Sequence, residues 1–67
     1  MSIAKVSELI SDSPESFEDA LTKGIARADK TLRNVSGAWV SSQKVIVNKG
    51  KITKYRVILR VTFVLDD

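Results

Sequence analysis

The sequence has no cysteine and no histidine, and each absence removes a common way of stabilising a small protein. Without cysteine there is no disulfide, and without either residue the usual structural zinc sites cannot form. The chain has 67 residues, and a chain this short buries only roughly 60% of the surface that its unfolded form exposes. We therefore expect one domain, residues 1–67, that is stabilised by association with further subunits.

The same absences argue against an enzyme. A serine nucleophile would have no histidine to activate it, and no G-x-S-x-G, P-loop or paired-carboxylate spacing occurs. Met1–Ile10 includes Lys5 and Glu8, and it is too short and too polar for a secretory signal or a membrane span. We expect a cytoplasmic protein without catalytic activity and without a membrane partner.

Charge is also modest, with eleven Lys and Arg against eight acids and a formal net charge of +3. Ordinary surface lysines account for such a balance, so it does not predict nucleic-acid binding. Lys49, Lys51 and Lys54 would be the contacts, but the adjacent aromatic residue, Tyr55, belongs by alternation to a core face. We expect no nucleic-acid partner.

A strand followed by a helix is predicted for the first half of the chain. Ile3–Ile10 reads as the strand, ended by the Ser, Asp and Pro cluster at Ser11–Pro14. Ser13 predicts an N-cap with Pro14 as the first helical residue, and the helix should run to about Arg33.

One apolar stripe follows this predicted helix. Its members recur at helical spacing: Phe17, Leu21, Ile25, Ala28 and Leu32. Gly24 lies beside the stripe, either because another backbone approaches closely there or because a glycine is tolerated.

Two strands joined by a tight turn are predicted for the second half. Ala38–Val47 is rich in Val and Ile, and Asn48, Lys49 and Gly50 predict a hairpin turn. Residues 54–65 then alternate with a period of two, which separates two faces of a strand. The face expected to cover the helix has Tyr55, Val57, Leu59, Val61, Phe63 and Leu65; the other has Lys54, Arg56, Ile58, Arg60, Thr62 and Val64. Apolar residues interleaved with arginines on this second face favour a subunit interface over scattered exposed side chains.

The sequence resembles the dodecin family in three segments. They are S-P-E-S-F-E-D-A at Ser13–Ala20, A-R-A-D-K-T-L-R-N at Ala26–Asn34 and Y-R-V-I-L-R-V-T-F at Tyr55–Phe63. The resemblance implies an α+β fold of the type β-α-β-β, in which a three-stranded antiparallel sheet curls around one helix. It also implies a hollow homododecamer that binds flavin, riboflavin or FMN, without enzymatic turnover.

Two flavin contacts that this resemblance implies are replaced. In flavin-binding dodecins a Trp at the start of the second strand stacks on the flavin ring, and a Gln early in the third strand contacts it. Aligned without gaps, these positions fall on Gly37 and Arg56, and a polar position that is often acidic falls on Ser42. Since Gly37 has no surface to stack on a ring, affinity for flavin in the family's pose should fall.

Trp39 keeps flavin as the leading ligand. It lies two residues after Gly37, so in a regular strand both point to one face about 6.6 Å apart. Trp39 can then stack on a planar ligand in the slot beside Gly37, with Arg56 as a partner from the neighbouring strand. We expect storage of flavin or another planar anionic molecule by Gly37, Trp39, Ser42 and Arg56. Packing of Trp39 in a subunit interface is the alternative explanation.

A flavin-free assembly is the alternative function, either structural or binding a metal ion such as calcium. Loss of both flavin contacts resembles a branch of the family in which a calcium site has been proposed for one group. Arg56 would then be a salt-bridged strand residue, with Glu8 as an available partner. In several copies around a symmetry axis, Asp66 and Asp67 offer oxygen ligands to a hard cation, although terminal acids are usually only solvated.

Overall fold

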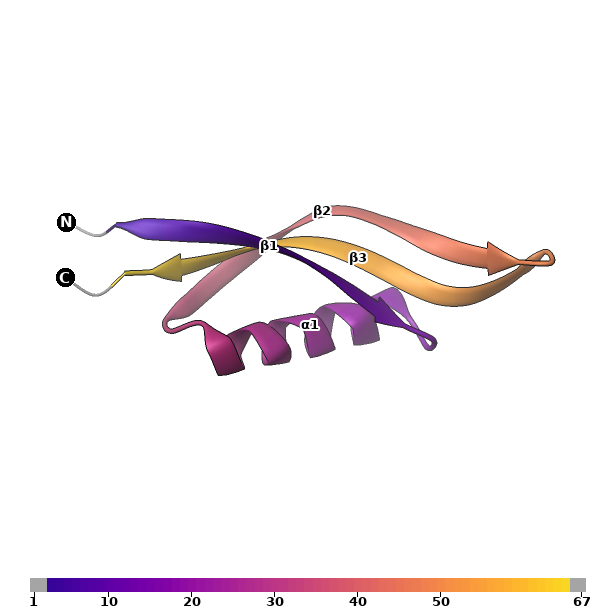
Figure 1. Ribbon diagram of the computed structural model, residues 1–67, viewed down its shortest axis with the longest axis horizontal. Coiled ribbons are helices and arrows are strands. Elements are labelled where there is room, and N and C mark those ends of the chain that lie inside the picture. Colours follow the sequence, from indigo (N-terminus) through magenta and orange to yellow (C-terminus); the bar gives the residue numbers. More distant parts are fainter. Residues whose placement is uncertain (1–2, 66–67) are drawn as a thin grey trace.

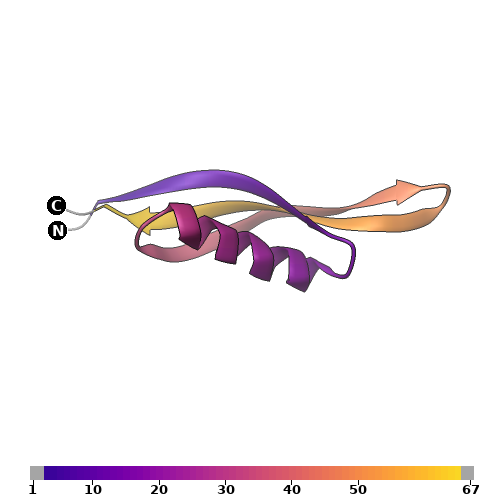
Figure 2. The same ribbon diagram turned by 60° about the horizontal axis from the view of Figure 1, so that its bottom comes forward.

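A computed structural model describes residues 3–65 and shows the β-α-β-β order that the sequence predicts. The elements are β1 (Ala4–Ser13), α1 (Phe17–Thr31), β2 (Val35–Asn48) and β3 (Lys51–Val64). β3 lies in the middle of one antiparallel sheet, with β1 and β2 on either side. α1 packs on one face of this curved sheet (Figures 1 and 2). The predicted α+β fold is confirmed.

The helix begins at Phe17, not at the predicted Pro14. Ser16 is the N-cap, because its Oγ accepts a hydrogen bond from the backbone N–H of Asp19 at 2.9 Å. Ser13, the predicted cap, is instead the buried last residue of β1, and its hydroxyl donates to Asp19 Oδ2 at 2.6 Å. Ser13 and Ser16 both precede the helix and either could cap it. In the folded chain Ser13 belongs to β1, and Ser16 is the cap. No helix within residues 3–65 is long and apolar enough to cross a membrane.

β1 continues into the Ser, Asp and Pro cluster that was predicted to end it. It ends at Ser13 instead of Ile10, because Ser11 and Asp12 both pair with residues of β3. The Oγ of Ser11 also donates a hydrogen bond to the backbone carbonyl of Ala20 at 2.7 Å. The predicted end of the strand was wrong because these polar residues find partners on α1 and β3, which the strand's own sequence does not reveal.

The core lies between α1 and the predicted inner face of β3. Val57, Leu59 and Val61 are at most 1% exposed, which confirms the alternation at these positions. Small residues of the helix approach this face most closely: Ala20, Gly24 and Ala28 are its buried positions. The larger members of the predicted stripe are partly buried against this contact: Phe17, Leu21, Ile25 and Leu32.

Gly24 marks a close approach between α1 and the sheet. A Cβ at this position would lie 3.0 Å from Leu59 Cδ1 and 3.0 Å from Ser11 Cβ. Both distances are shorter than the 3.5 to 4.0 Å or so at which carbon atoms attract best. The atoms that crowd this position belong to the side chains of Leu59 and Ser11. The glycine therefore serves close packing of the helix against side chains of the sheet, and not the approach of a second backbone.

The hairpin between β2 and β3 turns at Lys49 and Gly50, as predicted. Their φ angles are 52° and 77°, and positive values at both central residues are what a type I′ turn requires. Asn48 pairs with Lys51 across the turn. Because β1 pairs with β3 only as far as Tyr55, the end of the hairpin projects beyond both β1 and α1 (Figure 1).

We expect Gly24→Val to lower the free energy of unfolding by roughly 1–3 kcal/mol, because the added methyl groups overpack the contact with Leu59 and Ser11. Thermal unfolding at one fixed protein concentration measures the change. Ala26→Val introduces the same side chain at an exposed position of α1, and it should cost less than about 1 kcal/mol. Equal losses in the two variants would contradict the close contact.

Candidate functional site

All four predicted site residues lie on the sheet face that α1 does not cover. Residues paired directly across antiparallel strands share a face. Gly37 pairs with Thr62 and Trp39 with Arg60, and these β3 residues alternate with the buried ones. We call this surface the outer face. Its members are Val6, Glu8, Ile10 and Asp12 of β1, Gly37, Trp39, Ser42 and Lys44 of β2, and Arg56, Ile58, Arg60 and Thr62 of β3.

A β-bulge brings Ser42 onto the outer face. Trp39 and Val40 pair with consecutive residues of β3, after which the pairing skips Ser41 and resumes at Ser42. Strict alternation from Trp39 would have turned Ser42 toward the helix side, and the extra residue restores it to the outer face. The family resemblance, and not strand geometry, had drawn attention to Ser42.

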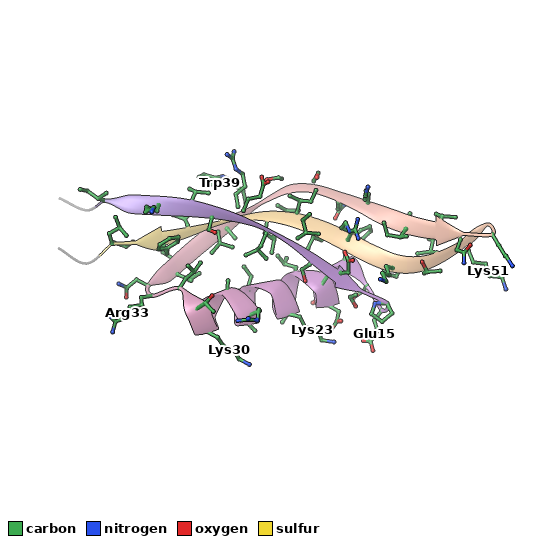
Figure 3. The ribbon with its side chains drawn as sticks, in the orientation of Figure 1. Glu15, Lys23, Lys30, Arg33, Trp39 and Lys51 are labelled. Atoms are coloured by element: carbon green, nitrogen blue, oxygen red, sulfur yellow. The ribbon has the colours of Figure 1, made fainter. Side chains whose placement is uncertain are left out.

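Trp39 is exposed beside an open place at Gly37. The Trp39 residue is 61% exposed and its side chain points away from α1 (Figure 3). A Cβ at Gly37 would meet no atom within 4 Å. The structure thus has the elements of the slot that the sequence suggested, an accessible indole and vacant space on the same face. An exposed indole can stack on a planar ring.

Arg56 is held by Asp12 and does not lie opposite Trp39. Its Nε and Nη2 donate to the two carboxylate oxygens of Asp12 at 2.7 and 2.9 Å, which forms a bidentate ion pair. The hydrogen bond between these side chains is the main cause that lowers the pKa of Asp12 and raises the pKa of Arg56. The sequence had suggested Glu8 as the ion-pair partner, and that partner was wrong.

Arg60 takes the place opposite Trp39. Its side chain is 59% exposed, and its Nε lies 4.0 Å from Glu8 Oε2, too far for a strong hydrogen bond. A guanidinium that is exposed and loosely paired can bind an anionic group of a ligand. Sequence reasoning missed Arg60 as a site residue. If the residues of β2 and β3 are paired one by one outward from the turn at Lys49 and Gly50, Trp39 falls opposite Arg60. The structure keeps this pair because the two register shifts between the turn and Trp39 offset each other.

No preformed metal site occurs in the part of the chain that the structure describes. Among residues 3–65, no three or more His, Cys, Asp or Glu side chains come together in a group that could hold a metal ion. Asp66 and Asp67, the terminal acids considered for calcium, lie outside the described residues. A calcium site built from three or more carboxylates of residues 3–65 would therefore need carboxylates from more than one subunit.

A cavity of about 220 Å³ lies elsewhere, between the end of α1 and the end of β3. It is lined by Thr31, Leu32, Arg33, Phe63, Val64 and Leu65, and it includes none of the predicted site residues. Ligand pockets commonly have volumes of about 300 to 1,000 Å³. The outer face is thus the better candidate, but one subunit presents it as an open surface.

Asp12→Asn should reduce the loss of stability at low pH. The folded state lowers the pKa of Asp12, so its ion pair stabilises the fold above the ordinary carboxyl pKa of about 3.9. That contribution disappears as the pH falls through the lower pKa of the folded state.

Melting temperatures between neutral pH and about pH 2 test this expectation. The unmodified protein should lose stability below about pH 4 more steeply than Asp12→Asn. Asp29→Asn removes an exposed carboxylate of α1 and should keep the steep profile. If Asp12→Asn keeps it as well, the ion pair with Arg56 does not stabilise the fold.

Known proteins are similar to this chain in sequence and in fold. The Dodecin family model matches residues 3–66. The calcium dodecin of Mycobacterium tuberculosis is 39% identical over 64 residues, which cover 94% of this chain and 89% of that protein. The dodecin of Thermus thermophilus is 32% identical over 65 residues, covering 97% and 94% of the two chains.

Solved structures agree with these sequence matches. The dodecin from Streptomyces davaonensis superposes with a TM-score of 0.92 at 32% identity, covering 98% of this chain and 97% of that one. The calcium dodecin of M. tuberculosis superposes with a TM-score of 0.83 at 35% identity, covering 97% and 93%. That protein is described as calcium chelating, with a novel calcium-binding site.

Proposed function

The chain belongs to the dodecin family, and on this premise we propose that it is a non-enzymatic protein that binds and stores a small ligand in the cytoplasm. Its single domain, residues 1–67, is one subunit of a hollow homododecamer. Flavin, as riboflavin or FMN, is the leading ligand. The observation that carries this proposal is Trp39, 61% exposed beside the open place at Gly37 on the uncovered face of the sheet.

The proposed pocket lies between the outer faces of two subunits. Within one subunit Val6 is 46% exposed and Ile10 61% exposed, on the same face as Trp39. Contiguous exposed apolar residues among charges are typical of surfaces that a partner covers. A planar ligand on Trp39 would still expose its second ring face, and a second copy would cover it. Interface packing and ligand stacking are then compatible roles for Trp39.

Each residue of the pocket has a proposed role. Trp39 stacks on the isoalloxazine ring, and Gly37 leaves room for that ring beside the strand. Arg60, opposite Trp39, binds an anionic group such as the FMN phosphate. Ser42 offers a hydroxyl further along the face, and Arg56 adds positive charge there. Nothing in this arrangement supplies a nucleophile with its base.

Titration of the protein into riboflavin and into FMN, followed by flavin fluorescence, tests the ligand. We expect quenching at micromolar protein, and Trp39→Ala should weaken binding about tenfold because the stacking surface is lost. Val40→Ala, at the next position of β2 on the opposite face, should bind like the unmodified protein. Unchanged emission with both flavins would contradict the proposal.

The same titration distinguishes the proposed role of Arg60 in ligand binding from that of Arg56. Arg60→Gln should weaken FMN binding about tenfold while riboflavin binding changes little, because only FMN has a phosphate. Arg56→Gln should have a smaller effect on FMN, since Asp12 already occupies its guanidinium. Equal effects of the two substitutions would contradict the placement of the phosphate near Trp39.

Calcium is the second candidate ligand, because the relative that is 39% identical is a calcium dodecin. Carboxylates from several subunits would have to supply the oxygen ligands. On the outer face Glu8 is the better placed of the two acids, because its contact with Arg60 is loose and its side chain is 63% exposed, whereas Asp12 is held by Arg56.

Melting temperatures with calcium and with a chelator test this candidate. A rise in calcium that Glu8→Gln abolishes, while Glu18→Gln on α1 retains it, would support a site on the outer face. If calcium leaves the melting temperature unchanged, the metal function is wrong, and a protein that also binds no flavin would be a structural assembly.

A further inference from the structure

Charge is segregated along the chain. The acids of the described residues all fall between Glu8 and Asp29, and none occurs from Lys30 to Leu65. That second stretch is strongly basic: it contains Lys30, Arg33, Lys44, Lys49, Lys51, Lys54, Arg56 and Arg60. A small net charge of +3 therefore conceals a molecule with an acidic region and a basic region. Such a distribution steers association between complementary surfaces.

The most isolated basic surface is the hairpin arm, by which we mean residues 46–54. Lys49, Lys51 and Lys54 are exposed on it, and no carboxylate belongs to it. Val47 and Ile52 are register partners, 56% and 51% exposed, so an apolar pair lies among the lysines. A two-stranded hairpin is only marginally stable by itself in water. This combination of charge and apolar surface is typical of a surface that a partner covers.

The complementary surface is the acidic segment, by which we mean residues 14–18 before and at the start of α1. Glu15 and Glu18 are exposed there, and no ion pair of either carboxylate is found within residues 3–65. Within the same subunit Glu15 acts on Lys23, as a minor cause that raises the pKa of Lys23. The neighbouring acids are already engaged. Asp12 binds Arg56, and Asp19 binds Lys23 at 3.0 Å and the hydroxyl of Ser13. Pro14 is exposed and adds an apolar edge.

The arm of a subunit cannot fold back onto its own acidic segment. The subunit is 51 Å long, and the arm continues the sheet past the start of α1. Figure 3 shows Lys51 at the tip of the arm, well beyond Glu15 along this axis. The acidic segment that the arm can reach therefore belongs to another molecule. Two arms would repel each other, because each carries only positive charge.

We propose that the hairpin arm of one subunit docks on the acidic segment of a second copy, with Lys49 and Lys51 facing Glu15 and Glu18. Every copy carries both surfaces, so the contact can repeat and close by symmetry. This inference rests on the proposed assembly and goes beyond it, because it names the surfaces and the charges that select the partner. Apolar contact of Val47 and Ile52 with Pro14 accompanies the ion pairs.

Charge reversal and its compensation test this docking. Analytical ultracentrifugation over a dilution series gives the protein concentration at which half of the subunits are assembled. Lys49→Glu with Lys51→Glu should raise this concentration at least about tenfold, because attraction becomes repulsion. Glu15→Lys with Glu18→Lys should do the same. All four substitutions in one chain restore opposite charges between copies and should return the value to within about threefold.

Arg27→Glu with Lys30→Glu is the matched control, because it makes the same change in net charge at exposed positions of α1. It should leave assembly nearly unchanged. The docking is wrong if the arm reversal behaves like this control, as it would if the lysines only protect an edge strand from aggregation. It is also wrong if the fourfold variant stays as weak as either double variant. An unmodified protein that is monomeric throughout the dilution series would instead overturn the proposed assembly.

Discussion

One helix has to cover a sheet with two faces and a projecting hairpin, and this constraint shapes the whole subunit. α1 brings Ala20, Gly24 and Ala28 against β3, where Gly24 lets the helix approach closely. The resulting core is narrow: among residues 3–65 its fully buried large apolar side chains are Val57, Leu59 and Val61, all from β3. No helix or strand of the described chain packs over the outer face or the hairpin arm. A subunit built this way has its remaining apolar surface available for other copies and for a ligand.

Some charged residues of the outer face form a tight ion pair within the subunit, and others are exposed and could bind a ligand. Asp12 ties Arg56 to β1 through two short hydrogen bonds, which joins two strands at the edge of the arm. Arg60 has only a distant carboxylate, and Trp39 stands beside it with its indole accessible. A ligand on this face would therefore meet an aromatic surface and a guanidinium that can be released at little cost. The family resemblance predicts flavin contacts at the positions of Gly37 and Arg56, whereas the exposed indole and guanidinium of this chain belong to Trp39 and Arg60.

The elements with strong periodicity could be predicted from the sequence, and the contacts between elements could not. Alternation along β3 identified Val57, Leu59 and Val61 as core, because a period of two needs no knowledge of the neighbours. The start of α1 was misplaced because either Ser13 or Ser16 could cap it, and the structure places Ser13 in β1, paired with Tyr55, while Ser16 caps the helix. Arg60 was overlooked because the residue that lies opposite Trp39 depends both on the position of the turn and on the bulges between β2 and β3. Gly37 and Ser42 came from the family resemblance, and their roles with a ligand stay predictions.

The native mass of the purified protein at low micromolar concentration tests most directly whether this subunit works only within an assembly. The account predicts one dominant species near 89 kDa, twelve times the 7.4 kDa of the chain. It also predicts that this mass persists on dilution within the low micromolar range, because the exposed outer faces and hairpin arms are covered by other copies. A stably folded species of 7.4 kDa would contradict it, since the outer face would then be tolerated in open solvent.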